Sequence, residues 1–266
     1  MRTRALRDVA RRPLSTAGAV VAVVFIAVPL VALVSRVQWT ELPRHLGSTE
    51  ALDAIRLSLV TSLSAAALSV LLGLPLAWLL ARVSFPGRAL LRAVVLLPMV
   101  LPPVVGGVAL LGAFSRNSTL GGWLHDTFGV QLTFSPAGVV LAQTFVALPF
   151  FVITAEAALR SMDHRLEEAA ATLGANPSMV FRRVTVPAVM PSLVAGTVLA
   201  WARALGEFGA TITFAGNIAG RTRTLPLAVY VELESRPEVA VSLSLVLLTV
   251  SMLVIVSLRE NWLGPR

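Results

Sequence analysis

The 266-residue chain contains no cysteine and no lysine, since all 22 of its basic residues are arginine. The absence of cysteine excludes disulfides and thiolate metal sites. Charged side chains make up only 14% of the residues and the mean hydropathy is +0.81, which argues against a soluble fold. The composition therefore predicts a membrane protein.

Catalytic signatures are also missing. The sequence has no P-loop, no H-E-x-x-H, no G-x-S-x-G and no cluster of acids. The three histidines, His45, His125 and His164, fall in three different polar segments. An intramembrane enzyme would need acids or histidines at one depth of its helices. We therefore expect no catalytic residue, no bound cofactor and no metal site in this chain.

Six apolar runs are long enough to cross about 30 Å of hydrocarbon, which takes roughly 20 residues of helix. These runs, none of which contains a charged residue, are 14–35, 57–81, 93–114, 135–155, 184–202 and 239–258. Backbone groups in lipid must be hydrogen-bonded within the protein, so helices are expected, and no period-2 pattern indicates a barrel. We predict an all-α integral membrane protein with six transmembrane helices in one domain, 1–266.

The arginines predict the orientation. If the N-terminus is inside, fourteen arginines fall in cytoplasmic segments and seven in outer ones, which satisfies the positive-inside rule and places both termini in the cytoplasm. This topology and anionic lipid account for the net charge of +8 without a nucleic-acid partner. The run 14–35 behind a basic leader could instead be a secretory signal. It is longer than a typical signal core and no A-x-A site follows, so we expect a retained first helix.

A polar segment, 156–183, separates the fourth and fifth runs on the predicted cytoplasmic side. Residues 156–173 read as a helix rich in alanine and glutamate, and Gly174 is a typical helix stop. Asn176 suits an N-cap and the following proline suits the first turn of a second short helix, 177–184. This pattern predicts a helix, a turn and a short helix that project from the membrane. An ordinary capped loop is the alternative.

The same segment resembles the EAA loop of ABC-importer permeases. The likeness rests on Glu168-Ala169-Ala170, on Gly174 four residues later, on Phe181 and on Pro187. In that family the loop holds the coupling helix, which docks into a cleft on a cytosolic ATPase subunit. The residues expected to couple this chain to an ATPase are Glu168, Ala169, Ala170, Gly174, Pro177, Met179, Phe181, Arg182 and Pro187.

Other stretches resemble oxyanion-importer permeases, and molybdate permeases in particular. They are "LLPMVLPPVVGG" at 96–107 and "RALGEFGATITFAGNIAGRTRTLPLAVY" at 203–230, within a likeness that covers 57–258. Some molybdate permeases begin near the second run, so the first helix lies outside the likeness and is expected to pack peripherally. Sulfate permeases share the EAA loop and diverge after it. Molybdate or tungstate is therefore the expected substrate, and sulfate or another tetrahedral oxyanion is the alternative.

The resemblance implies a type I ABC-importer permease fold in a bacterial inner membrane. It also implies a homodimer, two cytosolic ABC ATPase subunits that hold ATP and Mg, and an extracytoplasmic oxyanion-binding protein. The chain has no nucleotide-binding motif of its own, as expected of a separate permease subunit. An ion channel, which would move its substrate without ATP or partners, is the alternative from a different class.

Prolines and glycines crowd the third run, which is therefore predicted to be kinked or locally unwound, either for packing or to line a pore. Arg203 and Glu207 lie one turn apart at the end of the fifth run, either as functional groups or as a self-neutralising pair. Further on, Thr224 is predicted to cap a short outer helix, 225–234. The candidate pathway and gate residues are Pro98, Pro102, Pro103, Gly106, Gly107, Arg203, Gly206, Glu207 and Gly209.

Overall fold

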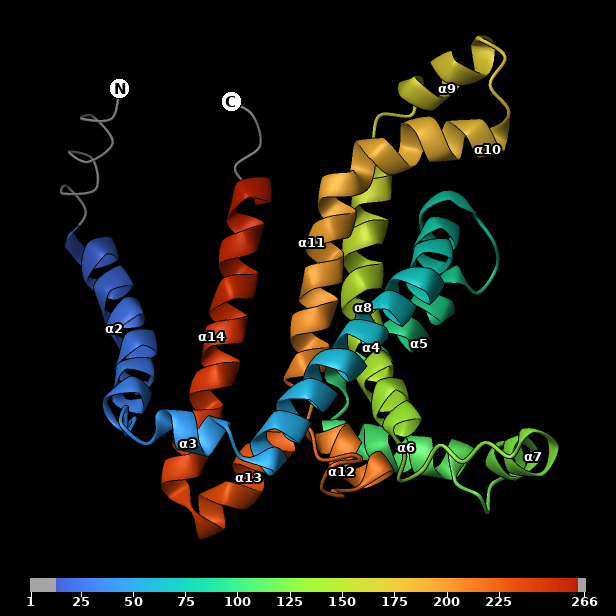
Figure 1. Ribbon diagram of the computed structural model, residues 1–266. Coiled ribbons are helices and arrows are strands. Elements are labelled where there is room, and N and C mark those ends of the chain that lie inside the picture. The colour runs from blue at the N-terminus through green and yellow to red at the C-terminus, as the bar shows by residue number, and fades with distance from the viewer. Residues whose placement is uncertain (1–12, 263–266) are drawn as a thin grey trace.

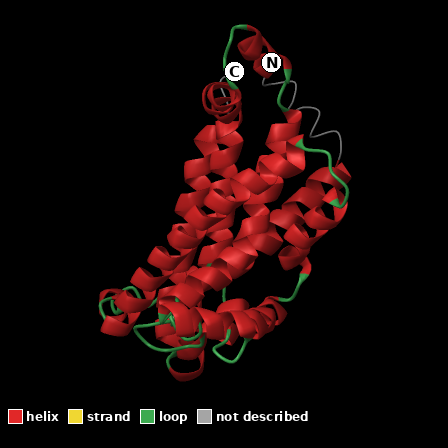
Figure 2. Cartoon of the chain, turned by 90° about the vertical axis from the view of Figure 1, so that its right-hand side faces the viewer, coloured by secondary structure: helices red, strands yellow, loops and turns green. Residues whose placement is uncertain are grey.

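The protein is a bundle of long helices with shorter helices at both ends, seen in a computed structural model that describes residues 13–262 (Figure 1). Within that range every regular element is a helix, which confirms the all-α prediction. Figure 2 shows the same arrangement from the side, with most loops toward the two ends of the long helices.

Five helices in the described range are long and apolar enough to cross a membrane. They are α2 (Pro13–Ser35), α4 (Thr49–Arg82), α8 (Pro136–Ser161), the helix that ends as α11 (Val186–Leu205), and α14 (Pro237–Trp262). A sixth span is formed if α5 (Arg88–Val100) and α6 (Pro103–Phe114) are counted together. These two helices are bent by 118° at Leu101 and Pro102. The predicted kink in the third run is thus confirmed, and it is a sharp break.

The core lies where α8 packs between α4 and α11. Small residues allow the close approach of α4 to α8. A Cβ atom at Gly73 of α4 would lie only 2.6 Å from Cδ1 of Phe151 in α8, so any other residue there would displace the Phe151 ring. Close packing of this kind holds transmembrane helices together, because lipid gives no hydrophobic driving force between them. α8 is accordingly the most buried span, at 56% of its apolar window.

The first helix lies at the edge of the bundle, as expected. None of the apolar window of α2 is buried within the chain. It faces α14 across an apolar groove lined by Leu30 and Val31 on one side and by Leu248 and Met252 on the other. The basic leader that precedes it and the last four residues of the chain lie outside the described residues. The predicted retention of the first helix and the predicted cytoplasmic location of both termini therefore stay predictions.

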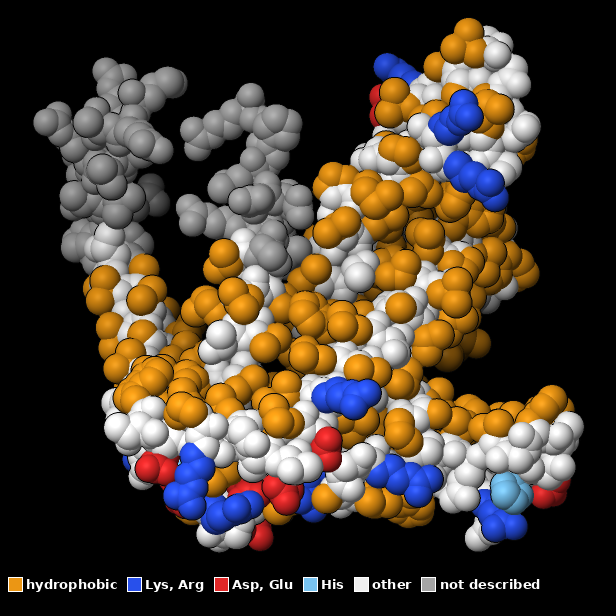
Figure 3. Space-filling model, viewed as in Figure 1, with side chains coloured by type: hydrophobic (Ala, Val, Ile, Leu, Met, Phe, Trp, Pro, Cys, Tyr) orange, Lys and Arg blue, Asp and Glu red, His pale blue; other side chains and the backbone are white. Residues whose placement is uncertain are grey.

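The short helices gather at the two ends of the bundle (Figure 1). At the lower end lie α3 (Leu42–Leu46), α7 (Thr119–Phe128), α12 (Gly209–Ala215) and α13 (Leu225–Ser235). At the upper end lie α9 (Arg165–Thr172) and α10 (Pro177–Val180), toward which α2 begins and α14 ends. Figure 3 shows a band of hydrophobic side chains over the middle of the molecule, with most charged side chains above and below it. This pattern fits a membrane-spanning body with two polar ends.

The helix predicted at 156–173 is wrong, because the structure divides it. α8 ends at Ser161, Met162 takes an extended conformation with ψ of 137°, and α9 begins at Arg165. The Asp163 carboxylate accepts a hydrogen bond of 3.0 Å from the backbone N–H of Arg165. A short acidic side chain that bonds to the backbone in this way competes with helix continuation. The break turns α9 away from the axis of α8 (Figure 1).

The end predicted for the short helix at residue 184 is also wrong. α10 passes into a π-helical turn, η1 (Phe181–Thr185), which leads directly into α11. The backbone N–H of Val186 bonds to the carbonyl oxygen of Phe181, five residues earlier. The next residue, Pro187, has no N–H to donate, so a regular α-turn cannot be completed there. The segment therefore bends without a break in the helix.

Thr224 does not cap α13 with its side chain, contrary to the prediction. Its backbone has the extended conformation of an N-cap residue, but its buried hydroxyl has no hydrogen-bond partner among the described residues. The backbone N–H of Leu225 instead donates to Oγ of Ser58 in α4, at 2.6 Å. Because Ser58 is distant in the sequence, only the folded chain supplies this partner.

Candidate functional site

The segment from α9 to α10 forms a compact turn at the upper end of the molecule. Gly174 has φ of +89°, in the left-handed region that favours glycine. Its N–H bonds to the carbonyl oxygen of Ala171, and the N–H of Ala175 bonds to that of Ala170. This pair of bonds is the Schellman ending of a helix, with the glycine one position beyond it. The prediction that Gly174 stops the helix is confirmed.

Asn176 then starts α10 as predicted. Its Oδ1 accepts a hydrogen bond of 2.9 Å from the backbone N–H of Met179, and Pro177 occupies the first turn. Side chains around the turn project into the surroundings: Leu173 is 90% exposed and Met179 is 41% exposed. We call α9, the turn and α10 the coupling segment, 165–180. Six of the nine predicted coupling residues are exposed in this segment or within two residues of it, namely Glu168, Ala169, Gly174, Pro177, Met179 and Arg182, and Pro187 is exposed in the first turn of α11.

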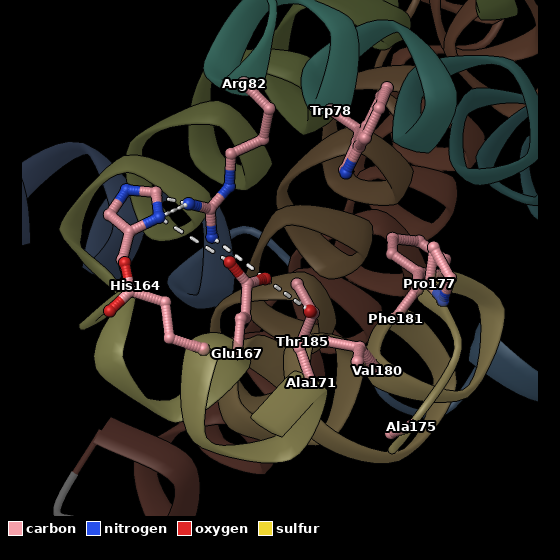
Figure 4. Close-up of a pocket in the computed structure, with 11 residues that line it drawn as sticks. Trp78, Arg82, His164, Glu167, Ala171, Ala175, Pro177, Val180, Phe181 and Thr185 are labelled. Carbon is pink, nitrogen blue, oxygen red and sulfur yellow. Dashed lines mark hydrogen bonds and ion pairs between the residues drawn. The ribbon is translucent and has the colours of Figure 1, made fainter. Parts of the chain in front are cut away.

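The other two, Ala170 and Phe181, are partly buried, and Phe181 lines a groove of about 780 Å³ between the coupling segment and α4 (Figure 4). On one side, α4 contributes Trp78 and Arg82. On the other, α9 contributes Glu167 and η1 contributes Thr185. The groove separates the coupling segment from the body of the bundle except where polar side chains bridge it.

Glu167 provides that bridge. Its Oε1 lies 3.2 Å from Nη2 of Arg82 and accepts a hydrogen bond of 2.5 Å from Oγ1 of Thr185. His164 lies beside them, with Nε2 at 2.8 Å from Nη1 of Arg82 (Figure 4). The Arg82 side chain is only 10% exposed and that of Glu167 is 23% exposed, so the pair is poorly screened by solvent. One carboxylate of the coupling segment therefore touches both α4 and the turn that leads into α11.

Sequence reasoning missed these bridging residues. The resemblance singles out Glu168, which is exposed, whereas the neighbouring Glu167 makes the internal contacts. Arg82 is 85 residues away along the chain, and nothing in its local sequence indicates the pairing. The sequence could have indicated only that Arg82 ends a helix, because a basic side chain is favourable in the last turn of a helix. It could not have indicated the partner.

At the other end of the bundle, predicted pathway residues meet where α6 packs on α12. A Cβ atom at Gly107 would lie 2.6 Å from Cβ of Thr213, and one at Gly209 would lie 2.8 Å from Cβ of Pro103. Gly106 faces Phe145 of α8 in the same way, at 3.1 Å. The sharp break before α6 and these glycines together allow two short helices to lie against each other.

Arg203 and Glu207 form the i,i+4 ion pair that their spacing allows, with Nη1 and Oε2 2.5 Å apart. The Glu207 side chain is only 1% exposed, and it also accepts a hydrogen bond of 2.8 Å from the N–H of Ala210 in α12. The carboxylate thus joins the end of α11 to the start of α12.

The other pathway candidates are not part of this contact. Pro98 lies within α5, Pro102 precedes α6, and Gly206 follows α11 without a close neighbour outside its own helix. In the part of the chain that the structure describes, no group of three or more histidine, aspartate or glutamate side chains is placed to hold a metal ion. The arrangement consists of an exposed, hydrogen-bonded turn at one end and closely packed short helices at the other.

Comparison with known proteins identifies the family. Residues 69–266 match the family described as "Binding-protein-dependent transport system inner membrane component". The chain belongs to this family. This chain is 49% identical to the molybdenum transport system permease protein ModB of Mycobacterium tuberculosis over 239 residues, which are 89% of each chain. It is 44% identical to ModB of Escherichia coli K12, over 80% of this chain and 93% of that protein.

This chain is also 37% identical to the sulfate transport system permease protein CysT of Escherichia coli K12, over 87% of its length and 84% of that protein. Among solved structures, a bacterial alginate ABC transporter in complex with a pentasaccharide-bound periplasmic protein matches with a TM-score of 0.74 at 18% identity, over 96% of this chain and 95% of that chain. The MetNI methionine ABC transporter matches with a TM-score of 0.58 at 19% identity, over 79% of this chain and 95% of that chain. These likenesses confirm the predicted ABC-importer permease fold.

Proposed function

We propose that this chain is the membrane-spanning permease subunit of an ATP-driven importer for molybdate, with tungstate as a close analogue. The observation that carries the proposal is the ranking of relatives. Proteins named as molybdenum permeases reach 49% and 44% identity over most of both chains, whereas the sulfate permease reaches 37%. Sulfate or another tetrahedral oxyanion is the second candidate, and its similarity over 87% of this chain is what favours it.

The coupling segment is the part that we assign to an ATPase partner. Two copies of this chain form a homodimer, and each presents its exposed turn, with Leu173 and Met179, to a cytosolic ABC ATPase subunit that binds ATP and Mg. Closure of the ATPase subunits displaces the turn. Because Glu167 contacts both Arg82 and Thr185, the displacement is passed to α4 and to α11 together. The chain itself hydrolyses nothing.

The contact between α6 and α12 is the part that we assign to the outer gate, facing an extracytoplasmic oxyanion-binding protein. The two helices approach closely at Gly107 and Gly209, and packed helices of this kind can shift against each other as units when the bundle moves. The buried Glu207 neutralises Arg203 there, and a dianion therefore meets no free positive site that would trap it. The binding protein then determines most of the substrate selectivity. In the same topology, both termini of the chain lie in the cytoplasm.

The test is uptake by proteoliposomes that contain the whole complex of this chain, its ATPase and its binding protein. We expect accumulation of radiolabelled molybdate that requires ATP and binding protein and is suppressed by excess tungstate but weakly by excess sulfate. Suppression by sulfate alone would favour the second candidate. Accumulation without ATP would contradict an importer of this class and indicate a channel.

A further inference from the structure

A second charged cluster lies at the upper end of the bundle and is separate from the groove. We call it the Glu156 joint. Its members are Arg88 and Arg92 of α5, Glu156 and Arg160 of α8, and the carbonyl oxygen of Leu80 in α4. Nε of Arg92 lies 3.1 Å from Oε1 and 3.3 Å from Oε2 of Glu156, and its Nη2 donates to Oε1 as well.

Arg160 and Arg88 extend the joint to α4. Nε of Arg160 donates to Oε1 of Glu156 at 2.9 Å, and its Nη2 donates to the Leu80 carbonyl at 3.1 Å. Nη2 of Arg88 donates to the same carbonyl. Carbonyls in the last turn of a helix lack intrahelical partners, so the two arginines complete the end of α4. α5 and α8 thus meet at the Glu156 carboxylate, and Arg88 and Arg160 link them to the end of α4.

Glu156 is the only acidic group in the joint, and its side chain is 9% exposed. The Arg92 side chain is 34% exposed and that of Arg160 is 44% exposed, so the arginines reach solvent while the carboxylate does not. Charge-assisted bonds from a guanidinium to a buried carboxylate fix both distance and orientation. Loss of the carboxylate would leave the arginines to repel one another.

α5 depends on this joint for its position. None of its side chains is buried within the chain, and its main neighbour is α8. Apart from Leu91 and Val95, which pack against the main core, α5 has few apolar contacts within the chain, whereas its continuation α6, beyond the 118° bend, packs closely against α12 and α8 at glycine positions. The joint fixes the upper end of a helix whose lower end leads to the proposed outer gate.

The position of Glu156 connects the joint to the coupling segment. Glu156 lies near the end of α8, the helix that leads through Met162 into α9. We propose that Glu156 is a positioning residue: it ties α5, and with it the bend before α6, to the end of α8 that carries the coupling segment. Displacement of that segment then turns α5 as well as α4 and α11. This inference rests on the proposed function as an ATP-driven transporter but not on the identity of the anion.

The first experiment measures ATP hydrolysed per anion transported by the reconstituted complex. In Glu156→Gln we expect this ratio to rise by about tenfold, since hydrolysis continues while its movement no longer reaches α5. Glu156→Asp should restore part of the coupling. The matched control is Glu232→Gln, which removes an equally buried carboxylate, 10% exposed, that pairs with Arg236 at the opposite end. A merely structural role would lower transport and hydrolysis in proportion and leave the ratio unchanged.

The second experiment follows α6 directly and needs no transported anion. Because the chain has no cysteine, a single Val104→Cys, at a position 53% exposed, gives one reactive thiol in α6. We measure its rate of modification by a maleimide in the whole complex, with and without a non-hydrolysable ATP analogue. The rate should change with nucleotide in the Glu232→Gln background and should no longer change in the Glu156→Gln background.

These readouts separate the two proposals. If the complex carries no oxyanion but nucleotide still alters the Val104→Cys rate through Glu156, the substrate assignment fails and the inference stands. If transport is normal and Glu156→Gln keeps both the ratio and the nucleotide response, the inference fails alone. Arg92→Lys, which keeps the charge but not the two-pronged contact, provides a second variant. Failure of both variants to assemble would also overturn the inference, because the joint would then serve folding only.

Discussion

At the scale of single residues, the coupling segment depends on one backbone conformation. Gly174 adopts φ of +89° with nothing within 4 Å of the position that a Cβ atom would occupy. Space therefore does not select glycine there. The left-handed conformation does, because it costs other residues about 1–2 kcal/mol. Asparagine tolerates this conformation better than most residues and is the natural conservative replacement.

Gly174→Leu is expected to abolish coupled transport while membrane insertion survives. The strain of about 1–2 kcal/mol is small beside the stability of a whole domain, but it falls on the bonds that shape the turn. Uptake and substrate-stimulated ATPase activity of the reconstituted complex provide the measurement, and Gly174→Asn should retain most of both.

Gly129→Leu is the matched control for this prediction. Gly129 ends α7 with φ of +67° and also has nothing within 4 Å of its Cβ position, so the substitution imposes similar strain outside the coupling segment. Uptake should then be nearly normal. A Gly174→Leu complex with full substrate-stimulated ATPase activity would show that the turn does not face the ATPase.

At the scale of elements, the break between α5 and α6 matters because it lets α6 lie on α12. Prolines at 102 and 103 remove the N–H groups that would continue the helix, and the residues beyond them form a new helix in a different direction. The close contact then requires glycine at one position of each helix, Gly107 opposite Thr213 and Gly209 opposite Pro103. Broken helices of this kind occur where transporters line a pathway.

Gly107→Leu should force α6 away from α12 and reduce uptake severely. The added side chain would overlap Thr213, and overpacking of this kind costs roughly 1–3 kcal/mol. Thermal unfolding of the purified complex and uptake by proteoliposomes measure the two effects. Gly112→Leu, in the same helix but with nothing within 4 Å, is the control and should leave both near normal. Equal behaviour of the two variants would exclude a role for this contact.

At the scale of the whole molecule, an apolar band separates two polar ends (Figure 3). The coupling segment lies at one end and α13 lies at the other (Figure 1). The excess of arginine in the segments that share the end of the coupling segment predicts that this end is cytoplasmic. At the opposite end, the Glu232 carboxylate hydrogen-bonds to Arg236, and the bond and the negative charge raise the pKa of that guanidinium.

Single cysteines in the cysteine-free chain test this orientation. Leu173→Cys, at a 90% exposed position in the turn, should react with a membrane-impermeant maleimide only after cells are permeabilised. Leu233→Cys, at a 60% exposed position in α13, should react while the cytoplasmic membrane is intact, provided that the reagent can reach the outer face of that membrane. The reverse labelling pattern would mean that the arginine count gives the wrong topology, and the assignment of the coupling segment to a cytosolic ATPase would fail with it.

Local chemistry was enough for the sequence to determine much of this protein. Uninterrupted apolar runs specify helices in lipid, Gly174 and Asn176 specify a helix end and a helix start, and the prolines around residue 102 specify a break. Each of these follows from backbone hydrogen bonding and dihedral preference within a few residues. The resemblance of the EAA loop added the family.

Tertiary structure decided which distant groups meet. The pairs Arg82–Glu167 and Arg92–Glu156 join residues 85 and 64 positions apart, and the residues adjacent to each partner are compatible with many other pairings. Likewise, the helix predicted at 156–173 breaks after Ser161, and the π-turn of η1 joins two helices that sequence reasoning had separated. Helix propensity sets the cost of each local conformation. The packing of α8 against α4 and α5 determines that the buried Glu156 carboxylate lies beside Arg92. That choice is made by contacts that exist only in the folded chain.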